Sequence, residues 1–375
     1  FMQAADQAAA ECASLALVLR DTPEGPQQWL DLARTPALQV IDLSAHADAQ
    51  ARARAAMQAD MQTPLDLARD PLAVQRLYDL GNGHHCWYQR AHHLATDGYG
   101  MALWRQRLAE LYAQRVAAGP ARQPLAPFAL LIAEDAAYRE SPKRAQDAAY
   151  WHDAFTPMPE VAGLAAGRPL ASHSCHRISM PLDAAQRQAL QAAATRADTS
   201  WPDLLTALTA LYCLRMAAAE STVLGIPFMG RLGSAASRAS ATTMNVLPLQ
   251  VRAMPGQPLA DFVEQLVRAQ AKARRHGRYR AEQLRRDLNL LGGQRRLHAA
   301  LINVQPFYKP LELPDLQARL EILGTGPIDD LTIGFRGDGT RQLELEIEAN
   351  PALYTLATTQ DHLARLPVFL QSALA

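Results

Sequence analysis

The chain has 375 residues, and its 37 Lys and Arg residues are balanced by 37 Asp and Glu residues, so the formal net charge is zero. This balance argues against a protein that binds nucleic acid or a membrane surface, because both partners require a surplus of basic side chains. At about 150 residues per domain, the length predicts two or three domains. With 49% hydrophobic and 20% charged residues, the composition is that of an ordinary globular protein.

Membrane and secretory segments are not expected. No apolar stretch approaches the roughly 18 residues that a membrane-crossing helix needs. The first residues, from Phe1 to Gln3, lack the basic and then apolar pattern of a signal peptide. We therefore expect a cytoplasmic protein.

Metal and disulfide chemistry are also disfavoured by the sequence. The four cysteines, at positions 12, 86, 175 and 213, are widely spaced and form no CxxC pair. Two short clusters, residues 84–86 and 173–176, combine His with Cys. Both lie in runs that predict strands, where neighbouring side chains point to opposite faces and cannot share an ion, so we expect no metal site.

The first part of the chain predicts alternating helices and strands. An alanine-rich helix opens the chain without a capping signal, so we expect that an element preceding Phe1 is missing. A Gly-Asn-Gly turn at 81–83 between two alternating runs predicts a β-hairpin that delivers a pair of histidines to a loop. In order, the expected elements are helix 4–13, strand 15–20, strand 38–43, helix 47–61, hairpin strands 73–80 and 86–92, and helix 101–118.

A connector rich in Pro, Gly and Ala at 157–172 separates two predicted lobes. We expect an N-terminal lobe over 1–145 and a C-terminal lobe over 146–375 that includes this linker. Leucine and isoleucine alternate with glutamate over 343–348, which predicts a sheet with one wet face. Two lobes that each combine a sheet with covering helices predict an α/β fold. The expected elements from 128 onward are helix 128–139, a helix carrying Tyr150 and Trp151, strand 176–180, helix 183–196, a helix opened by Ser200, strands 223–228 and 245–251, a helix from Leu259, and strands 299–304, 331–335 and 343–348.

The sequence HHxxxDG at 92–98 is the strongest chemical signal. Adjacent histidines followed by Asp97 at a strand-to-helix junction place an imidazole in a loop, where a carboxylate can turn back to support it. The alternative is a buried, hydrogen-bonded histidine pair without a catalytic role.

This motif resembles the HHxxxDG motif of condensation domains of nonribosomal peptide synthetases, a branch of the chloramphenicol-acetyltransferase-like superfamily. Further stretches in the same order are similar to the family over essentially the whole chain. They are YRES at 138–141, YW at 150–151, GIPFMGR at 225–231, NVLPL at 245–249 and NPALY at 350–354. The stretch RRHGRYRAEQL at 274–284 resembles the first domain of the enterobactin seryl synthetase, which joins an aryl acid to serine.

The resemblance implies two lobes in a V with an active-site tunnel between them. It implies an amide-forming acyltransferase in which a donor acyl thioester and an acceptor aminoacyl thioester meet at His93. His93 would orient the attacking amine, accept its proton or stabilise the tetrahedral species. His92 is expected to be structural, Asp97 to pair with Arg231, and Gly98 to give the loop backbone freedom. Asn245 is expected either to line the tunnel or to satisfy backbone groups at a strand end.

The implied substrates are phosphopantetheine arms of carrier proteins, without a tightly bound cofactor. The implied partners are peptidyl or aryl carrier proteins and an adjacent adenylation domain, with acyl-CoA as a further donor source. A starter position with an aryl or fatty acyl donor is favoured by the enterobactin-like stretch. Alternatives are a stand-alone N-acyltransferase that uses acyl-CoA, and a module that recruits carriers without catalysis.

Two departures and one surface complete the sequence analysis. The family's opening strand and helix are missing before Phe1, and Gly98 is followed by Tyr99-Gly100-Met101, which disfavours epimerisation. No GxSxG elbow or complete dinucleotide-binding loop occurs, so hydrolase and dehydrogenase functions are excluded. Basic residues between Arg268 and Arg286 are expected either to contact a carrier protein or its phosphate, or to form a solvated helix face.

Overall fold

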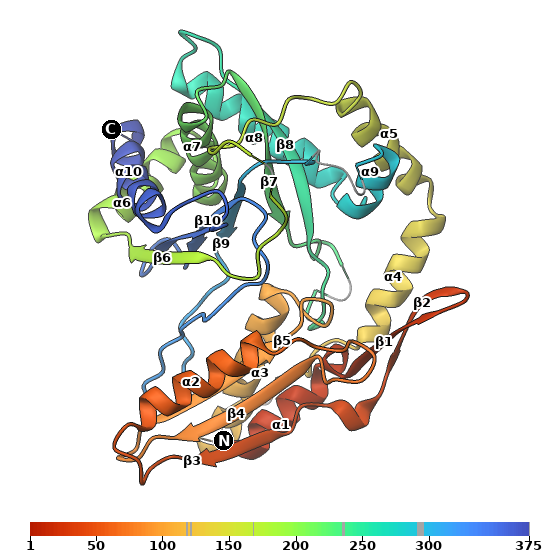
Figure 1. Ribbon diagram of the computed structural model, residues 1–375, viewed down its shortest axis with the longest axis vertical. Coiled ribbons are helices and arrows are strands. Elements are labelled where there is room, and N and C mark those ends of the chain that lie inside the picture. Colours follow the sequence, from red (N-terminus) through yellow and green to blue (C-terminus); the bar gives the residue numbers. More distant parts are fainter. Residues whose placement is uncertain (118, 121, 168, 235–236, 291–295, 375) are drawn as a thin grey trace. The chain divides into compact units, whose positions relative to one another are not determined.

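The structure is a computed structural model that describes residues 1–374 except 118, 121, 168, 235–236 and 291–295 (Figure 1). The predicted end of one helix at residue 118 and one residue of the predicted linker, 168, therefore lie outside the described residues. The chain divides into two compact units. Unit 1 consists of Phe1–Ala137, Arg231–Thr243 and Pro310–Thr325, and unit 2 of Tyr138–Gly230, Met244–Lys309 and Gly326–Ala375.

This grouping differs from a simple split at residue 145. Two later segments, Arg231–Thr243 and Pro310–Thr325, return to unit 1. Composition along the chain marks linkers, but it carries no sign that a later segment packs back on an earlier one.

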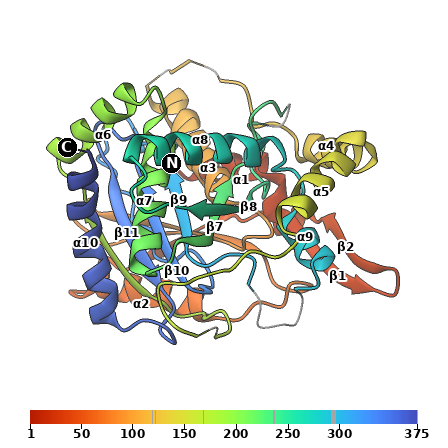
Figure 2. The same cartoon turned by 90° about the horizontal axis from the view of Figure 1, so that it is seen from above.

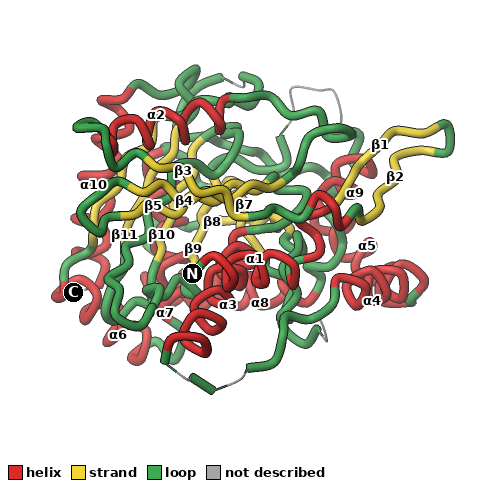
Figure 3. The backbone as a smooth tube through the Cα atoms, turned by 90° about the horizontal axis from the view of Figure 1, so that it is seen from below, coloured by secondary structure: helices red, strands yellow, loops and turns green. Residues whose placement is uncertain are grey.

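Unit 1 is built on the sheet order β3-β4-β5, in which β3 and β4 are parallel and β4 and β5 antiparallel. The predicted hairpin is present as β4 and β5. A separate antiparallel pair, β1 and β2, extends beyond the other strands of this unit (Figure 3). The elements are α1 Met2–Glu11, β1 Leu17–Thr22, β2 Gly25–Leu30, β3 Leu38–Asp42, α2 Ala49–Gln62, β4 Ala73–Asp79, β5 His85–Ala91, α3 Gly98–Val116 and most of α4 Phe128–Glu140, with short 3₁₀ turns at Ala13–Ala16 and Leu32–Arg34.

Helices cover both faces of this sheet, as Figure 1 shows for α1 and α2. Alternate residues of each strand point to opposite faces. One set, including Ala73 and Trp87, packs in the cluster that contains buried α1 alanines and Trp104 of α3. The other set, including Tyr78 and Tyr88, packs against α2. The end of β5 is therefore fixed from both sides.

Unit 2 contains a mixed sheet with the strand order β6-β11-β10-β9-β7-β8. Strand β9 is parallel to β10 and to β7, and the other neighbouring pairs are antiparallel. The elements are α5 Pro142–Ala154, β6 His176–Pro181, α6 Ala184–Arg196, α7 Trp201–Met216, β7 Ser221–Phe228, β8 Asn245–Arg252, α8 Leu259–Arg275, α9 Ala281–Asp287, β9 Leu301–Gln305, β10 Leu331–Arg336, β11 Glu344–Ala349 and α10 Leu356–Leu374.

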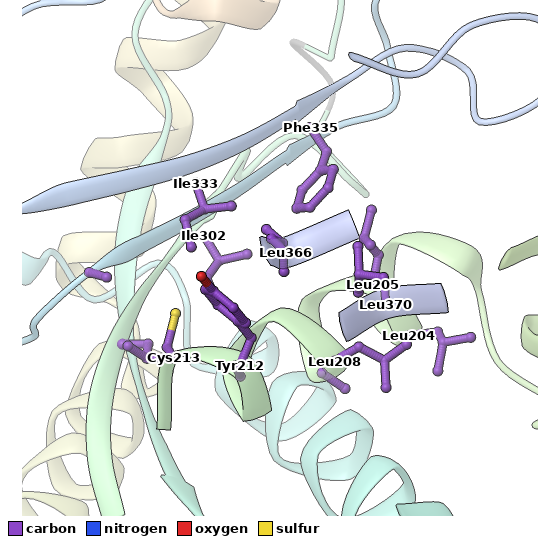
Figure 4. Packing of buried hydrophobic residues seen from close by; sticks show 14 of the residues in the cluster. Leu204, Leu205, Leu208, Tyr212, Cys213, Ile302, Ile333, Phe335, Leu366 and Leu370 are labelled. Carbon is purple, nitrogen blue, oxygen red and sulfur yellow. The ribbon is translucent and has the colours of Figure 1, made fainter. Parts of the chain in front are cut away.

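Helix α7 lies in the main core of unit 2. Its residues Leu205, Leu208 and Tyr212 pack with Ile333 of β10 and Leu366 of α10 in one buried cluster (Figure 4). Helix α10 lies beside α6 (Figure 2) and contacts β6 and β11. From Leu204 to Leu214 every position of α7 except Leu211 is buried, which explains why this part of the helix is largely apolar on all sides rather than on one stripe.

The prediction that one face of β11 is exposed to solvent is wrong. The carboxylates of Glu346 and Glu348 are as inaccessible as the alternating leucines, with residue exposures of 6% and 3%. Arg177 of β6 bonds Glu346 through Nε at 2.8 Å and lies 3.4 Å from Glu348, while Arg336 of β10 donates to Glu346 at 2.7 Å. Because β11 lies between β6 and β10, arginines from both neighbours neutralise a face that alternation alone assigns to water.

Candidate active site

The HHxxxDG loop joins the end of β5 to the start of α3, as predicted. His92 fixes its entry, because its N–H donates to Leu72 O (2.7 Å) and its carbonyl accepts from Ala95 N (2.9 Å). Asp97 is the N-cap of α3, and its Oδ1 accepts from Gly100 N at 2.8 Å. A carboxylate at this position satisfies an otherwise unpaired helix N–H and interacts favourably with the helix dipole. Hydrogen bonds thus anchor the loop at both ends.

His93 is the second residue of this loop, and it is exposed. Its carbonyl oxygen accepts a hydrogen bond from Thr242 Oγ1. Within the part of the chain that the structure describes, no hydrogen bond involves its imidazole, so both ring nitrogens remain available to a substrate. The ring can therefore accept or donate a proton, which a histidine locked in a buried pair could not.

His92 differs from His93 in its surroundings. It is half-buried, and its Nδ1 accepts a hydrogen bond from Leu94 N at 3.1 Å. Burial lowers the pKa of His92, and the neighbouring His93 lowers it further. A neutral ring with an unprotonated Nδ1 can accept the Leu94 N–H and so stabilise this turn, which fits the structural role predicted for His92.

The ion pair predicted between Asp97 and Arg231 is present. Arg231 Nη2 lies 3.1 Å from Asp97 Oδ1 and 3.3 Å from Oδ2, and both side chains are 3% exposed. The guanidinium also donates to the carbonyl oxygens of Ala239 and Ala241 and lies over the ring of Tyr99 at 5.1 Å. This pair is thus built into a network of buried hydrogen bonds.

The segment from Arg231 to Thr243 holds the loop through several bonds that sequence reasoning missed. Thr243 N donates to Asp97 Oδ2 at 3.0 Å, and Ser240 Oγ donates to Gly100 O at 3.2 Å. Ser14 donates in turn to the carbonyl of Ser240. The segment is rich in Ser, Thr and Ala, which are common in loops, so its composition carried no sign of this contact.

The reason predicted for the motif glycine is wrong. Gly98 is the first residue of α3 and is not among the glycines with positive φ, so the loop does not use its special backbone freedom. Gly100 is the constrained glycine instead. A Cβ there would lie 2.1 Å from Thr96 Oγ1 and 3.2 Å from Ala241 N. The absence of a side chain at position 100 lets the 231–243 segment pack on the first turn of α3.

Asn245 satisfies backbone groups, the second of its two predicted roles. Its Nδ2 donates to Gly277 O (2.8 Å) and Tyr279 O (2.7 Å), and its Oδ1 accepts from Val246 N and Ala281 N, both at 3.0 Å. The residue is 6% exposed. With all its polar atoms bonded to backbone, the side chain has no hydrogen-bonding capacity left for a substrate.

Many of the basic residues over 268–286 are engaged inside the chain. Arg274 pairs with Asp203, Arg268 with Glu264, and Arg280 donates to Met244 O at 3.2 Å. Lys272 and Arg278 lie over the rings of Tyr150 and Tyr138. These contacts account for much of the charge without an external partner.

No group of three or more His, Cys, Asp or Glu side chains that could hold a metal occurs among the described residues. In the same residues, no helix is long and apolar enough to cross a bilayer. The two His and Cys clusters at 84–86 and 173–176 form no such group.

Comparison with known proteins identifies the family. The model of the family described as Condensation domain matches residues 1–375. The chain belongs to the condensation domain family. The resemblance to condensation domains of nonribosomal peptide synthetases and the mixed α/β fold are thereby confirmed. Condensation domains are acyltransferases that form amide bonds.

Relatives of this condensation domain include large synthetases. It is 35% identical over 368 residues to the dimodular nonribosomal peptide synthase of Bacillus subtilis (strain 168), covering 97% of the chain and 15% of that protein. It is 34% identical over 347 residues to enterobactin synthase component F of Escherichia coli (strain K12), covering 92% of the chain and 27% of that protein. The chain thus spans about a quarter or less of these relatives.

Solved condensation domains share its fold. A mutant of the starter condensation domain of rhizomide synthetase RzmA, in complex with C8-CoA and Leu-SNAC, has a TM-score of 0.88 at 32% identity, covering 99% of this chain and 84% of that chain. The condensation enzyme VibH has a TM-score of 0.86 at 28% identity, covering 100% of this chain and 87% of that chain.

Proposed function

We propose that the chain is a starter-type condensation domain that joins an acyl donor, held as a thioester on a carrier protein or CoA, to an aminoacyl acceptor on a carrier protein. The observation that carries the proposal is the exposed imidazole of His93, which has no hydrogen bond within the described part of the chain, on a loop held by the buried Asp97–Arg231 pair. The starter assignment is supported by the similarity to the RzmA starter domain and to enterobactin synthase component F.

The chemistry requires little of the protein beyond positioning and one proton transfer. The amine nitrogen attacks the thioester carbonyl, the new C–N bond forms, and the C–S bond breaks to release a thiol. An α-amine has a pKa of about 8, so a useful fraction is already unprotonated near neutral pH. His93 orients this amine, accepts its proton as the tetrahedral species forms, and returns a proton to the departing sulfur. Holding two reactants together contributes several kcal/mol.

The proposal includes the partners that such chemistry needs. The substrates are the phosphopantetheine arms of peptidyl or aryl carrier proteins, with no tightly bound cofactor. An adenylation domain of the same synthetase would load the acceptor. CoA carries the same pantetheine thiol as a carrier arm, so an acyl-CoA donor presents the same reacting group.

His93→Ala tests the proposal. With C8-CoA and Leu-SNAC as substrates, we expect amide formation, measured by mass spectrometry, to fall by about 10²-fold or more, because general acid–base groups contribute that much. Since the ring is exposed and makes no hydrogen bond to any described residue, circular dichroism and the melting temperature should not change. A matched control is His46→Ala, which removes another exposed imidazole of unit 1. Turnover retained in His93→Ala would exclude a catalytic role for this residue.

A further inference from the structure

Thr242 makes the contact that holds the second histidine of the motif. Its Oγ1 donates to the carbonyl oxygen of His93. Other hydrogen bonds of the loop involve His92, through its N–H, its carbonyl and its ring, and Asp97, through its carboxylate. Among the described residues, His93 forms no hydrogen bond apart from the one to Thr242. The backbone of His93 is therefore fixed from one side by its covalent neighbours and from the other by this hydroxyl.

Thr242 is itself fixed by the residues on either side of it. The carbonyl of Ala241 accepts from Arg231 Nη2, and the N–H of Thr243 donates to Asp97 Oδ2 at 3.0 Å. Both neighbours thus bind the same buried ion pair. The Thr242 hydroxyl lies between two anchors in a segment that belongs to the same unit as the loop.

We infer that Thr242 is a positioning residue, whose hydroxyl transmits the geometry of the Asp97–Arg231 pair to the backbone of His93. This inference rests on the proposed function. Among the residues that the structure describes, the His93 imidazole has no hydrogen-bond partner, so its position follows from its backbone and its side-chain rotamers. A displacement of about 1 Å in a catalytic group can cost up to 10²-fold in rate, so a hydrogen bond to this carbonyl bears directly on turnover.

Two substitutions separate the hydroxyl from the shape of the side chain. Thr242→Val replaces the hydroxyl by a methyl group of similar volume, and Thr242→Ser keeps the donor. The matched control is Thr63→Val, since Thr63 Oγ1 also donates to a main-chain carbonyl, Ala59 O at 2.8 Å, at an exposed position of the same unit.

We expect Thr242→Val to lower kcat for C8-CoA and Leu-SNAC by roughly tenfold with little change in KM, as one lost hydrogen bond and a small displacement predict. Thr242→Ser should restore most of kcat, and Thr63→Val should match the wild type. Hydrogen exchange measured by mass spectrometry should be faster in the 92–98 peptide of Thr242→Val and unchanged in peptides of unit 2.

Each result decides the inference. An unchanged kcat in Thr242→Val, a rise in KM alone, or a failure of Thr242→Ser to restore kcat would overturn it. If the wild-type chain forms no amide with any donor, the proposed function fails, and exchange in the 92–98 peptide then decides the inference. Faster exchange would support the contact, and unchanged exchange would overturn it.

Discussion

At the scale of single residues, Arg231 is the side chain on which the loop most depends. Its guanidinium neutralises Asp97 and donates to two main-chain carbonyls, and the side chains of Arg231 and Asp97 are each only 3% exposed. Removing one partner of a buried ion pair leaves the other charge without water or a counterion. This cost exceeds the net contribution of the intact pair.

We therefore expect Arg231→Ala to lower the free energy of unfolding by about 3–5 kcal/mol. Urea denaturation followed by circular dichroism measures this change. Arg268→Ala is the control, because its pair with Glu264 is exposed and should contribute less than about 1 kcal/mol. Equal effects of the two substitutions would show that the buried pair does not stabilise the fold.

His92 should make the stability of the loop depend on pH. Burial lowers its pKa in the folded state, whereas in the unfolded chain it titrates near its ordinary value of about 6.5. The unfolded state therefore binds a proton first as the pH falls. The stability present above about pH 6.5 is lost as the pH drops through that value toward the folded pKa. Protonation would also require Nδ1 to release Leu94 N–H.

His92→Asn keeps an acceptor near the Nδ1 position but cannot titrate. We expect the free energy of unfolding of this variant minus that of the wild type to be larger at pH 5.5 than at pH 7.5, because only the wild type loses stability through protonation of residue 92. His298 and His362, whose pKa values are also lowered by burial, contribute equally to both proteins and cancel. A difference that does not vary with pH would contradict the neutral state assigned to His92.

At the scale of elements, the start of α3 depends on close packing by the 231–243 segment. A glycine inside a helix is normally destabilising, and replacing it by Ala would be expected to stabilise the helix by up to about 1 kcal/mol. Here a Cβ would meet Thr96 Oγ1 at 2.1 Å and the backbone nitrogen of Ala241 at 3.2 Å. Rotation of Thr96 relieves the first contact only, since Ala241 is held by Arg231.

Gly100→Ala should therefore destabilise the protein by about 1–3 kcal/mol, the usual cost of overpacking. It should also lower turnover, because Ala241 precedes Thr242. Gly334→Ala is the control, since its Cβ would meet its nearest atom, Glu346 O, at an ordinary 3.7 Å. Thermal unfolding measures the stability of both variants, and a Gly100→Ala protein more stable than the wild type would show that the contact is not tight.

Local patterns predicted most elements, because periodicity and turn residues act over short distances. The hairpin of β4 and β5 followed from its Gly-Asn-Gly turn, and α7 begins at the predicted Ser200 cap, which accepts from Asp203 N. The same patterns failed where distant segments decide burial. Glu346 and Glu348 alternate like exposed residues, but Arg177, 169 residues from Glu346, covers them.

At the scale of the whole molecule, the site depends on a contact between distant parts of the chain. Asp97 and Arg231 are 134 residues apart, and their pairing was predicted from resemblance to a family, not from spacing. Thr242 was not predicted at all, because a threonine in a polar loop looks like any other. Motif recognition finds the residues that share a family pattern. It does not find the supports that a particular chain supplies to them.

The source of the donor separates the proposed function from its alternatives. A starter condensation domain should accept C8-CoA or an acyl-loaded carrier with Leu-SNAC as acceptor, because both donors present a pantetheine thioester. We expect saturable amide formation with each donor, and loss of both activities in His93→Ala.

The alternatives give different patterns in the same assay, read by mass spectrometry of the products. A stand-alone N-acyltransferase would acylate a free amine from acyl-CoA and gain nothing from a thioester on the acceptor. A recruitment module would retain loaded carriers in a pulldown but release no amide from any pair. Because the His93 ring is exposed and makes no hydrogen bond to the residues that the structure describes, its removal should abolish chemistry without weakening carrier retention. The two measurements on one variant therefore separate catalysis from binding.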